Sequence, residues 1–219
     1  MEAQNPALEG LSIVLLGDFN PKIFQPAWFA AEELIRKRES EEAKIEIINP
    51  EIVIFSLDWA RLEIIRNRFT ISTNQEPYYE SLRDLVIGTF KLLRHTPIGK
   101  MGINIEMHFR MKSEEEWHTF GHKLAPKEIW NEILENPGLR SLTMEGNVRG
   151  DSLKGYIRVK VEPSPRFHPG ILFKVNDHYE IKAPNTAMGA DEIINTLENS
   201  WKESLKRSKG IINSLLEAS

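Results

Sequence analysis

The sequence contains no cysteine among its 219 residues. Disulfide bonds and thiolate metal ligands are therefore excluded, and a reducing compartment suits the chain. No apolar run approaches the roughly 20 residues that span a bilayer. The segment MEAQNPALEG at the start lacks the basic and apolar parts of a secretory signal. We therefore expect a cytoplasmic protein that is not associated with a membrane.

Motifs for catalysis and nucleotide binding are missing as well. The chain has no GxxxxGKS/T, GxGxxG or GxSxG motif and no paired-carboxylate motif. We predict no catalytic residue and no cofactor. The net charge of −4 provides no overall basic field of the kind that neutralises DNA phosphates. Nucleic-acid binding is not favoured, although a basic stripe near the C-terminus keeps it as an alternative: Lys202, Lys206, Arg207 and Lys209.

The most regular pattern is KMGINIEMHFRM, residues 100–111. Its apolar residues are Met101, Ile103, Ile105, Met107, Phe109 and Met111, and they alternate with Lys100, Gly102, Asn104, Glu106, His108 and Arg110. A period of two predicts a strand with one face in a core and one face in solvent.

The elements before this strand are marked by apolar runs and prolines. LSIVLL, residues 11–16, is a continuous apolar run, which predicts a strand buried on both faces. Pro26 suits the first turn of a helix, and Pro77 opens a second helix with an apolar stripe. Between the helices, strands are predicted at residues 44–48, 51–56 and 61–72, with a turn near residues 66–68 that splits the last one.

The elements after the central strand follow a similar order. Ser113 and Glu116 form a capping-box pair that predicts the start of a helix, with a second short helix at residues 126–134. Three alternating strands are predicted near residues 142–148, 157–161 and 171–181. A long amphipathic helix is expected from about Asp191 to Leu216.

Both halves thus show a strand, a helix, three or four strands and a long helix. RLEIIRNRFTIST and ILFKVNDHYEIKA, which precede the two long helices, share an apolar strand, a polar break, an aromatic residue and an isoleucine. This order resembles the duplicated helix-grip architecture of the TATA-box-binding-protein fold. TPIGKMGIN, residues 96–104, is also similar to a sporadic bacterial protein family without an assigned activity.

The resemblance implies an α+β fold. We expect two β-α-β(3-4)-α repeats, residues 1–95 and 96–219, that form one curved antiparallel sheet with the helices packed on one face. The exposed face should carry the function. The DNA-binding activity of the TATA-box-binding protein is not implied, because a saddle that binds the minor groove needs basic residues and apolar wedges. The predicted face carries charges of both signs and few aromatic residues.

Two groups of residues on that face are candidate sites. In the second half, a concave surface for a small ligand is predicted from His108, Arg110, Glu145, Arg149, Arg158 and His178. In the first half, a partner-binding apolar patch is predicted from Ile48, Ile52, Ile54, Trp59 and Ile65, provided that Val53, Phe55, Leu62 and Ile64 point into the core. The alternative is that the chain itself covers both faces of this half.

One helix carries a possible set of metal ligands. Glu115, His118 and His122 lie on one helical face, and two imidazoles with a carboxylate suit a divalent cation. A solvated helix face is the favoured interpretation, so no metal site is predicted.

The sequence therefore favours a non-catalytic protein. Its exposed sheet face and apolar patch would bind a protein partner or a second copy of the chain. The alternatives are an enzyme or small-ligand binder that uses the concave face, and a nucleic-acid binder that uses the C-terminal helix.

Overall fold

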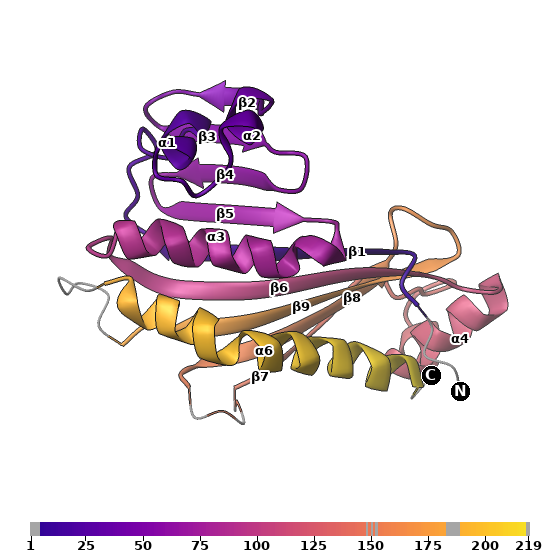
Figure 1. Cartoon of the computed structure of the whole chain (residues 1–219). Helices are drawn as coiled ribbons and strands as arrows, with labels where there is room; N and C mark the ends of the chain where they lie inside the picture. The colour runs from indigo at the N-terminus through magenta and orange to yellow at the C-terminus, as the bar shows by residue number, and fades with distance from the viewer. Residues whose placement is uncertain (1–4, 148, 150, 152, 183–188, 218–219) are drawn as a thin grey trace.

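One antiparallel sheet of nine strands forms the framework of the molecule (Figure 1). The structure is a computed structural model that describes residues 5–147, 149, 151, 153–182 and 189–217. The strands are β1 (Leu8–Gly17), β2 (Lys44–Ile48), β3 (Ile52–Ser56), β4 (Arg61–Ile65), β5 (Arg68–Thr73), β6 (Ile98–Arg110), β7 (Leu142–Gly146), β8 (Gly155–Pro163) and β9 (Gly170–Glu180). Their order is β2-β3-β4-β5-β1-β6-β9-β8-β7, so the curved sheet stays open and ends at β2 and β7.

The two halves of the chain meet at the central pair, β1 and β6. In their antiparallel register, Leu11 lies opposite Ile105 and Ile13 opposite Ile103. The alternation predicted for β6 is confirmed, because all its apolar members from Met101 to Phe109 are at most 4% exposed. The polar members of the strand point to the other face of the sheet.

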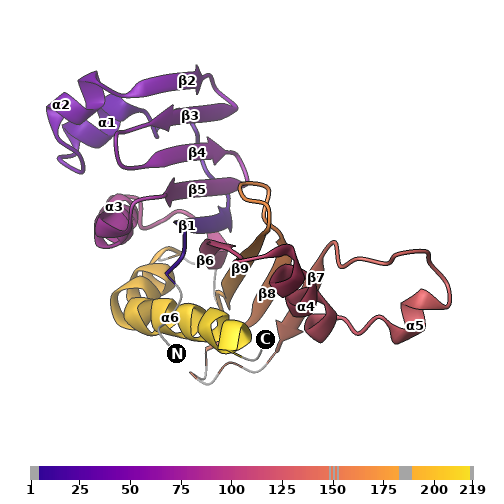
Figure 2. The same cartoon turned by 90° about the vertical axis from the view of Figure 1, so that its right-hand side faces the viewer.

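Apart from α5 (Glu128–Asn131), which projects to the side of the molecule, the helices lie on one face of this sheet. They are α1 (Pro26–Ala31), α2 (Lys37–Glu41), α3 (Tyr79–Leu92), α4 (Glu114–Leu124) and α6 (Asp191–Glu217), with a 3-10 turn, η1 (Glu76–Tyr78). Figure 2 shows α1, α2 and α3 on the same side of strands β2 to β5. α6 contacts β6 and β9, and Phe120 of α4 meets Phe173 of β9 with ring centroids 5.9 Å apart. The mixed α+β class with one large antiparallel sheet is therefore confirmed.

The core of the first half is built around phenylalanines. Phe24 packs on Phe69 with ring centroids 5.5 Å apart, and Phe69 on Phe90 of α3 at 5.3 Å. The inward positions predicted on β3 and β4 are confirmed, since Val53, Phe55, Leu62 and Ile64 are fully buried. These strands therefore present their alternate residues to the face without helices.

The prediction that residues 11–16 are buried on both faces is wrong. Only Leu11, Ile13 and Leu15 are buried, while Leu16 is 41% exposed. No described helix covers the opposite face of β1, where Ser12 lies beside the polar side chains of β6. The continuous apolar run therefore belongs to a strand with a single buried face.

Smaller differences occur at the ends of the helices. α1 ends at Ala31 and the chain reverses at Glu33, which has a φ of 58°, so the charged segment that follows forms the separate helix α2. The cap of α4 is confirmed, because Ser113 Oγ accepts from the Glu116 N–H at 3.1 Å. Glu116 accepts in turn from the Lys112 N–H at 2.7 Å. The strand predicted to reach Val148 ends at Gly146, and Val148 lies outside the described residues.

The two long helices, α3 and α6, are joined by polar contacts. Lys91 pairs with Glu198 at 2.7 Å, and Arg94 with Asp191 at 2.9 Å. Trp201 of α6 is 1% exposed, and its Nε1 donates to Glu80 Oε1 of α3 at 3.0 Å. These contacts tie the C-terminal helix to the N-terminal half of the chain.

One segment projects away from the sheet. Figure 2 shows α5 extended to the side of the molecule, at a distance from the other helices. Its region exposes four large apolar side chains, Ile129, Trp130, Ile133 and Leu134, each at least 50% exposed. Among the described residues, none of the helices has the length and apolar character that crossing a membrane requires.

Candidate functional site

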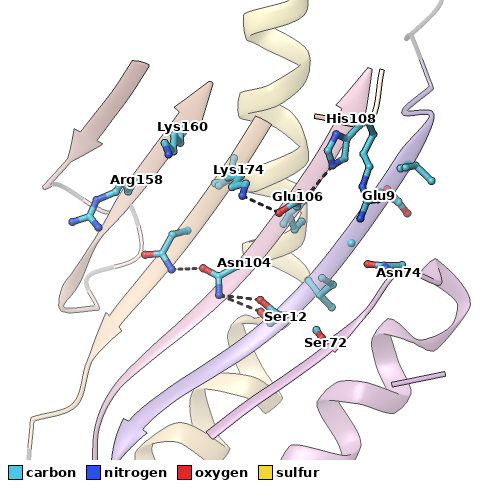
Figure 3. A pocket seen from close by; sticks show the side chains of 17 residues that line it. Glu9, Ser12, Ser72, Asn74, Asn104, Glu106, His108, Arg158, Lys160 and Lys174 are labelled. Atoms are coloured by element: carbon cyan, nitrogen blue, oxygen red, sulfur yellow. Dashed lines mark hydrogen bonds and ion pairs between the residues drawn. The ribbon is translucent and has the colours of Figure 1, made fainter. Parts of the chain in front are cut away.

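The face of the sheet without helices carries a groove of about 470 Å³ (Figure 3). It crosses β5, β1, β6, β9 and β8, and the helices lie behind the strands that form its floor. Four steps between neighbouring strands, each ~4.8 Å, give it a width of about 19 Å. Since β1 and β5 belong to one half of the chain and the other strands to the second, the groove lies across the junction of the two halves.

Two rows of residues run across the strands of the groove, and the strand register defines both rows. One row follows the paired positions Ser72, Ser12, Asn104, Asn176 and Arg158. The other follows Gly10, Glu106, Lys174 and Lys160. Alternation along each strand sends these side chains to the face opposite the core. The polar rows therefore result from the same period of two that buries the apolar residues.

Hydrogen bonds order the floor of the groove. Asn104 Nδ2 donates to Ser12 Oγ at 3.3 Å, and Asn176 Nδ2 donates to Asn104 Oδ1. The side chains of Ser72 and Asn74 also line the groove, and neither makes a hydrogen bond to another described residue. Amide and hydroxyl groups of the floor are thus held in place while others stay available to a ligand.

His108 stands at one end of the groove and is 5% exposed. Its Nε2 lies 3.1 Å from Glu106 Oε1, and its Nδ1 lies 2.9 Å from Ser164 Oγ. Ser164 Oγ already accepts from the backbone N–H groups of Arg166 and Phe167. Its own proton is therefore directed to His108 Nδ1, and Nε2 donates to Glu106. This chain of bonds fixes the orientation of both His108 and the carboxylate.

The walls of the groove are mainly cationic. They include Arg158, Lys160, Arg166 and Lys174, and the carboxylate of Glu106 lies between them. Glu106 Oε2 accepts from Lys174 at 3.3 Å. Glu9 also lines the groove, but its carboxylate is 3.7 Å from Lys209 of α6, on the helix face.

Two of the cations also pair with acids outside the groove. Arg158 bonds Glu145 at 2.6 Å, which raises the pKa of Arg158. Lys160 bonds Glu162 at 2.6 Å and lowers the pKa of that carboxyl. Arg166 is exposed and its guanidinium pairs with no described residue. Among the described residues that line the groove, basic side chains therefore outnumber acidic ones.

The predicted ligand-binding set is only partly brought together. His108 and Arg158 line the groove. Glu145 pairs with Arg158 beyond its wall. Arg110 lies at the end of β6, where its guanidinium stacks 3.9 Å from the Phe167 ring centroid. His178 lies on the same face as the groove but does not line it.

Arg149, the remaining member, lies on the opposite face of the sheet. It is 4% exposed and bonds Asp177, which points from β9 toward α6. Asp177 also accepts from Ser204 Oγ at 2.7 Å, Tyr179 Oη at 3.0 Å and Arg207 Nη2 at 2.9 Å. This buried cluster joins β9, the segment between β7 and β8, and α6.

Asp151 completes the buried cluster. It accepts from Arg149 at 2.8 Å and from Arg207 at 3.0 Å. Burial opposes its ionisation, but the bond from Arg149 prevails and lowers the pKa of Asp151. Of the C-terminal basic stripe, Arg207 is thus engaged here and Lys209 pairs with Glu76 at 2.8 Å, while Lys202 and Lys206 are exposed.

His178 is stacked on Tyr156 of β8, with ring centroids 4.3 Å apart and an angle of 15° between the planes. Its Nε2 is buried without a hydrogen-bond partner. Burial, and then the charge of Lys100, lower the pKa of His178, while Glu180 acts in the opposite direction. The neutral imidazole is therefore the form that the fold stabilises.

We expect the free energy of unfolding to decrease when the pH is lowered from about 7.5 to about 5.5, around the ordinary histidine pKa of about 6.5. The unfolded chain takes up the proton of His178 more readily than the folded chain, so stability present above the unfolded pKa is lost as the pH falls. Urea unfolding at both pH values should show a smaller loss in His178→Phe, which keeps a ring against Tyr156. An equal loss in both proteins would contradict this assignment.

The predicted apolar patch is divided between the faces of the sheet. Ile52, Ile54 and Ile65 lie on the face without helices, since they alternate with the buried core positions. Ile54 is only 9% exposed. Ile48 pairs with the inward Val53 and so lies on the helix side. Trp59 lies in the turn after β3, stacked on Tyr78 at 5.7 Å, and its Nε1 donates to Glu39 of α2 at 2.8 Å.

The sequence prediction did not include two of the exposed isoleucines of the first half. Ile45 and Ile47 of β2 are 58% and 41% exposed, and Ile48 beside them is 38% exposed. β2 is an edge strand in which all five residues are exposed. The register between β2 and β3 shifts at Ile45–Ile47, so Ile45 and Ile48 lie on the helix side and Ile47 on the other. The apolar residues of KIEII indicated a strand. No local pattern indicated that this strand lies at the edge of the sheet, where its isoleucines are exposed.

The candidate metal ligands of α4 do not form a centre. The rings of His118 and His122 lie 6.4 Å apart. Within the described ranges, no group of three or more histidine and acidic side chains is arranged to hold a metal ion. His118 instead contacts Trp117, which meets His168 edge to face at 5.2 Å.

Comparison with known proteins gives no relative from which a function could be transferred. No family model matches the chain, and no curated protein matches it significantly.

Proposed function

We propose that the protein is a non-catalytic assembly protein that pairs with a second copy of itself along strand β2. The observation that carries this proposal is the exposed edge strand with three exposed isoleucines, Ile45, Ile47 and Ile48. The outer backbone N–H and C=O groups of an edge strand form a template for another strand. Pairing would satisfy these groups and remove apolar surface from water at the same time.

A second copy suits this edge because the sequence of β2 complements itself. An antiparallel pairing of two β2 strands about Ile45 places Lys44 of each copy opposite Glu46 of the other. Opposite charges across strands contribute ~0.2–1 kcal/mol per pair. Lys44 has no partner among the described residues, and Glu46 pairs only with Arg61 there. The contact is the same on both copies, so it closes into a two-fold dimer.

The proposal includes a duplicated, TATA-box-binding-protein-like architecture with repeats at residues 1–95 and 96–219. Its support is the order of the strands. Read outward from the centre, one half runs β1, β5, β4, β3, β2 and the other runs β6, β9, β8, β7. In each half the first strand is followed by short helices, a meander and a long helix. The dimer would join two such sheets at their N-terminal edges. The cytoplasmic location of the protein stays a prediction.

We expect wild-type protein to form a dimer in analytical ultracentrifugation, and Ile45→Asp and Ile47→Asp to be monomers with unchanged circular dichroism. A buried, unpaired carboxylate at the strand junction would oppose pairing. Met144→Asp is the matched control, since Met144 is 64% exposed on β7, the other edge. It should leave the dimer intact.

Reversal of charge tests the register of the two strands. Lys44→Glu should weaken the dimer, and the double variant Lys44→Glu with Glu46→Lys should restore it. A wild-type monomer at all concentrations would contradict the proposal. Dissociation by Met144→Asp would place the interface on β7, and dissociation by Ile129→Asp would place it on the exposed α5 segment.

A further inference from the structure

The groove on the open face is separate from the β2 edge and has the composition of a ligand site. Its volume of about 470 Å³ falls within the ~300–1,000 Å³ of typical small-molecule sites. Strands supply most of its floor, and strand register fixes the relative positions of their side chains. A site built on such elements is rigid before the ligand arrives.

The floor offers both hydrogen-bond donors and hydrogen-bond acceptors. Asn104 and Asn176 are oriented by each other and by Ser12. Ser72 and Asn74 have donors and acceptors without described partners. Closely spaced amides and hydroxyls that both donate and accept match a ligand with several neighbouring hydroxyl groups.

The walls add charge to this recognition. Lys174 and Arg166 face the groove, and Arg166 has no partner among the described residues. The pairs that Lys174, Arg158 and Lys160 make are partly exposed, and their partners are Glu106, Glu145 and Glu162. Ion pairs of this kind are weak because water screens them, so a bound anion can replace them. The excess of positive charge indicates a ligand with an anionic group.

The lining also disfavours a nucleobase. The described residues that line the groove include no phenylalanine, tyrosine or tryptophan. Proteins that bind single-stranded nucleic acids depend on such rings, because the bases stack on them. His108 is the one ring at the groove, and its contacts with Glu106 and Ser164 hold it in a fixed orientation.

We infer that this groove binds a polyhydroxylated anion, namely a sugar that carries a phosphate, sulfate or carboxylate group. The amides and hydroxyls of the floor bind the sugar hydroxyls, and Lys174 with Arg166 binds the anionic group. The same chemistry is found in a free sugar phosphate and in an anionic oligosaccharide.

The test is isothermal titration calorimetry of the full chain at low ionic strength. The probes are glucose 6-phosphate and a heparin tetrasaccharide, with glucose and inorganic phosphate as controls. At least one of the two anionic sugars should bind at least 10-fold more tightly than either control, and the preferred one identifies the source. Lys174→Met and Arg166→Ala should each weaken binding 10-fold or more. Lys202→Met, an exposed lysine on α6 behind the sheet, is the matched control and should bind as wild type does.

Each other outcome overturns the inference. Absence of saturable binding by both anionic sugars would exclude the site, and equal binding of inorganic phosphate would reduce it to an anion site without sugar recognition. Binding that survives Lys174→Met and Arg166→Ala would place the ligand elsewhere. Ile45→Asp should bind the sugar as wild type does, because β2 does not line the groove. Failure of the dimer and failure of the sugar site are therefore distinguishable.

Discussion

Asp177→Ala should lower the free energy of unfolding by about 3–5 kcal/mol, the usual cost of removing one partner from a buried ion pair. Asp177 is fully buried. Its carboxylate accepts from two arginines, Arg149 and Arg207, and from the hydroxyls of Ser204 and Tyr179. The substitution would leave the hydroxyls of Ser204 and Tyr179 without this acceptor, and the two arginines would keep only their bonds to Asp151 and, for Arg149, to the His178 carbonyl. Urea unfolding followed by circular dichroism measures the change.

Glu180→Ala is the matched control, because Glu180 lies on the same strand but is exposed on the other face. It should change stability by less than about 0.5 kcal/mol. Asp177→Asn keeps an acceptor and should fall between the two. A loss below about 1 kcal/mol in Asp177→Ala would contradict the buried network, since that value is typical of an ordinary hydrogen bond.

This network also explains why the sequence placed Arg149 on the wrong side of the sheet. Residues between strands have no alternation to assign them to a face, so Arg149 was grouped with the polar residues nearby. The signal was present in β9, where Asp177 is in phase with the buried Phe173, Val175 and Tyr179. An acid at an inward position needs a buried cationic partner.

The sheet itself could be predicted because each strand carries its own local signal. The period of two in β6, β8 and β9 depends only on which residues are apolar, and it fixes both the strand and its buried face. The repeat of these signals in both halves predicted the α+β class. Residues 11–16 were given the wrong burial, because an apolar run contains no alternation from which to exclude a second buried face.

The groove could not be predicted in the same way. Its rows join Ser72 and Ser12 to Asn104 across three strands, and the register between these strands is a long-range property. The sequence identified the exposed residues of β6 and β9 but not their neighbours from β1 and β5. The same limit applies to the apolar patch. Trp59 lies in a turn, so the stacking on Tyr78 sets the direction of its side chain, and the alternation of the strands does not.

Trp201→Ala should lower the free energy of unfolding by about 3–5 kcal/mol, as is typical of a buried tryptophan. Trp201 lies on α6, in the C-terminal half. The Cζ atom of Arg83 on α3 lies 5.9 Å from the centroid of its ring, and its Nε1 donates to Glu80. The loss would therefore include the cavity and the hydrogen bond to Glu80. Urea unfolding should show a single transition at lower denaturant, because the substitution acts on the contact between the halves and on both cores at once.

The same substitution at a second tryptophan separates burial from side-chain chemistry. Trp130 is 50% exposed on α5, which projects from the sheet, whereas Trp201 is 1% exposed. Trp130→Ala should change stability by less than about 0.5 kcal/mol. Equal losses in the two variants would contradict the packing of α6 across the sheet. Two separate transitions in Trp201→Ala would show that the halves fold independently, and the groove between them would then depend on the contacts of β1 with β6 alone.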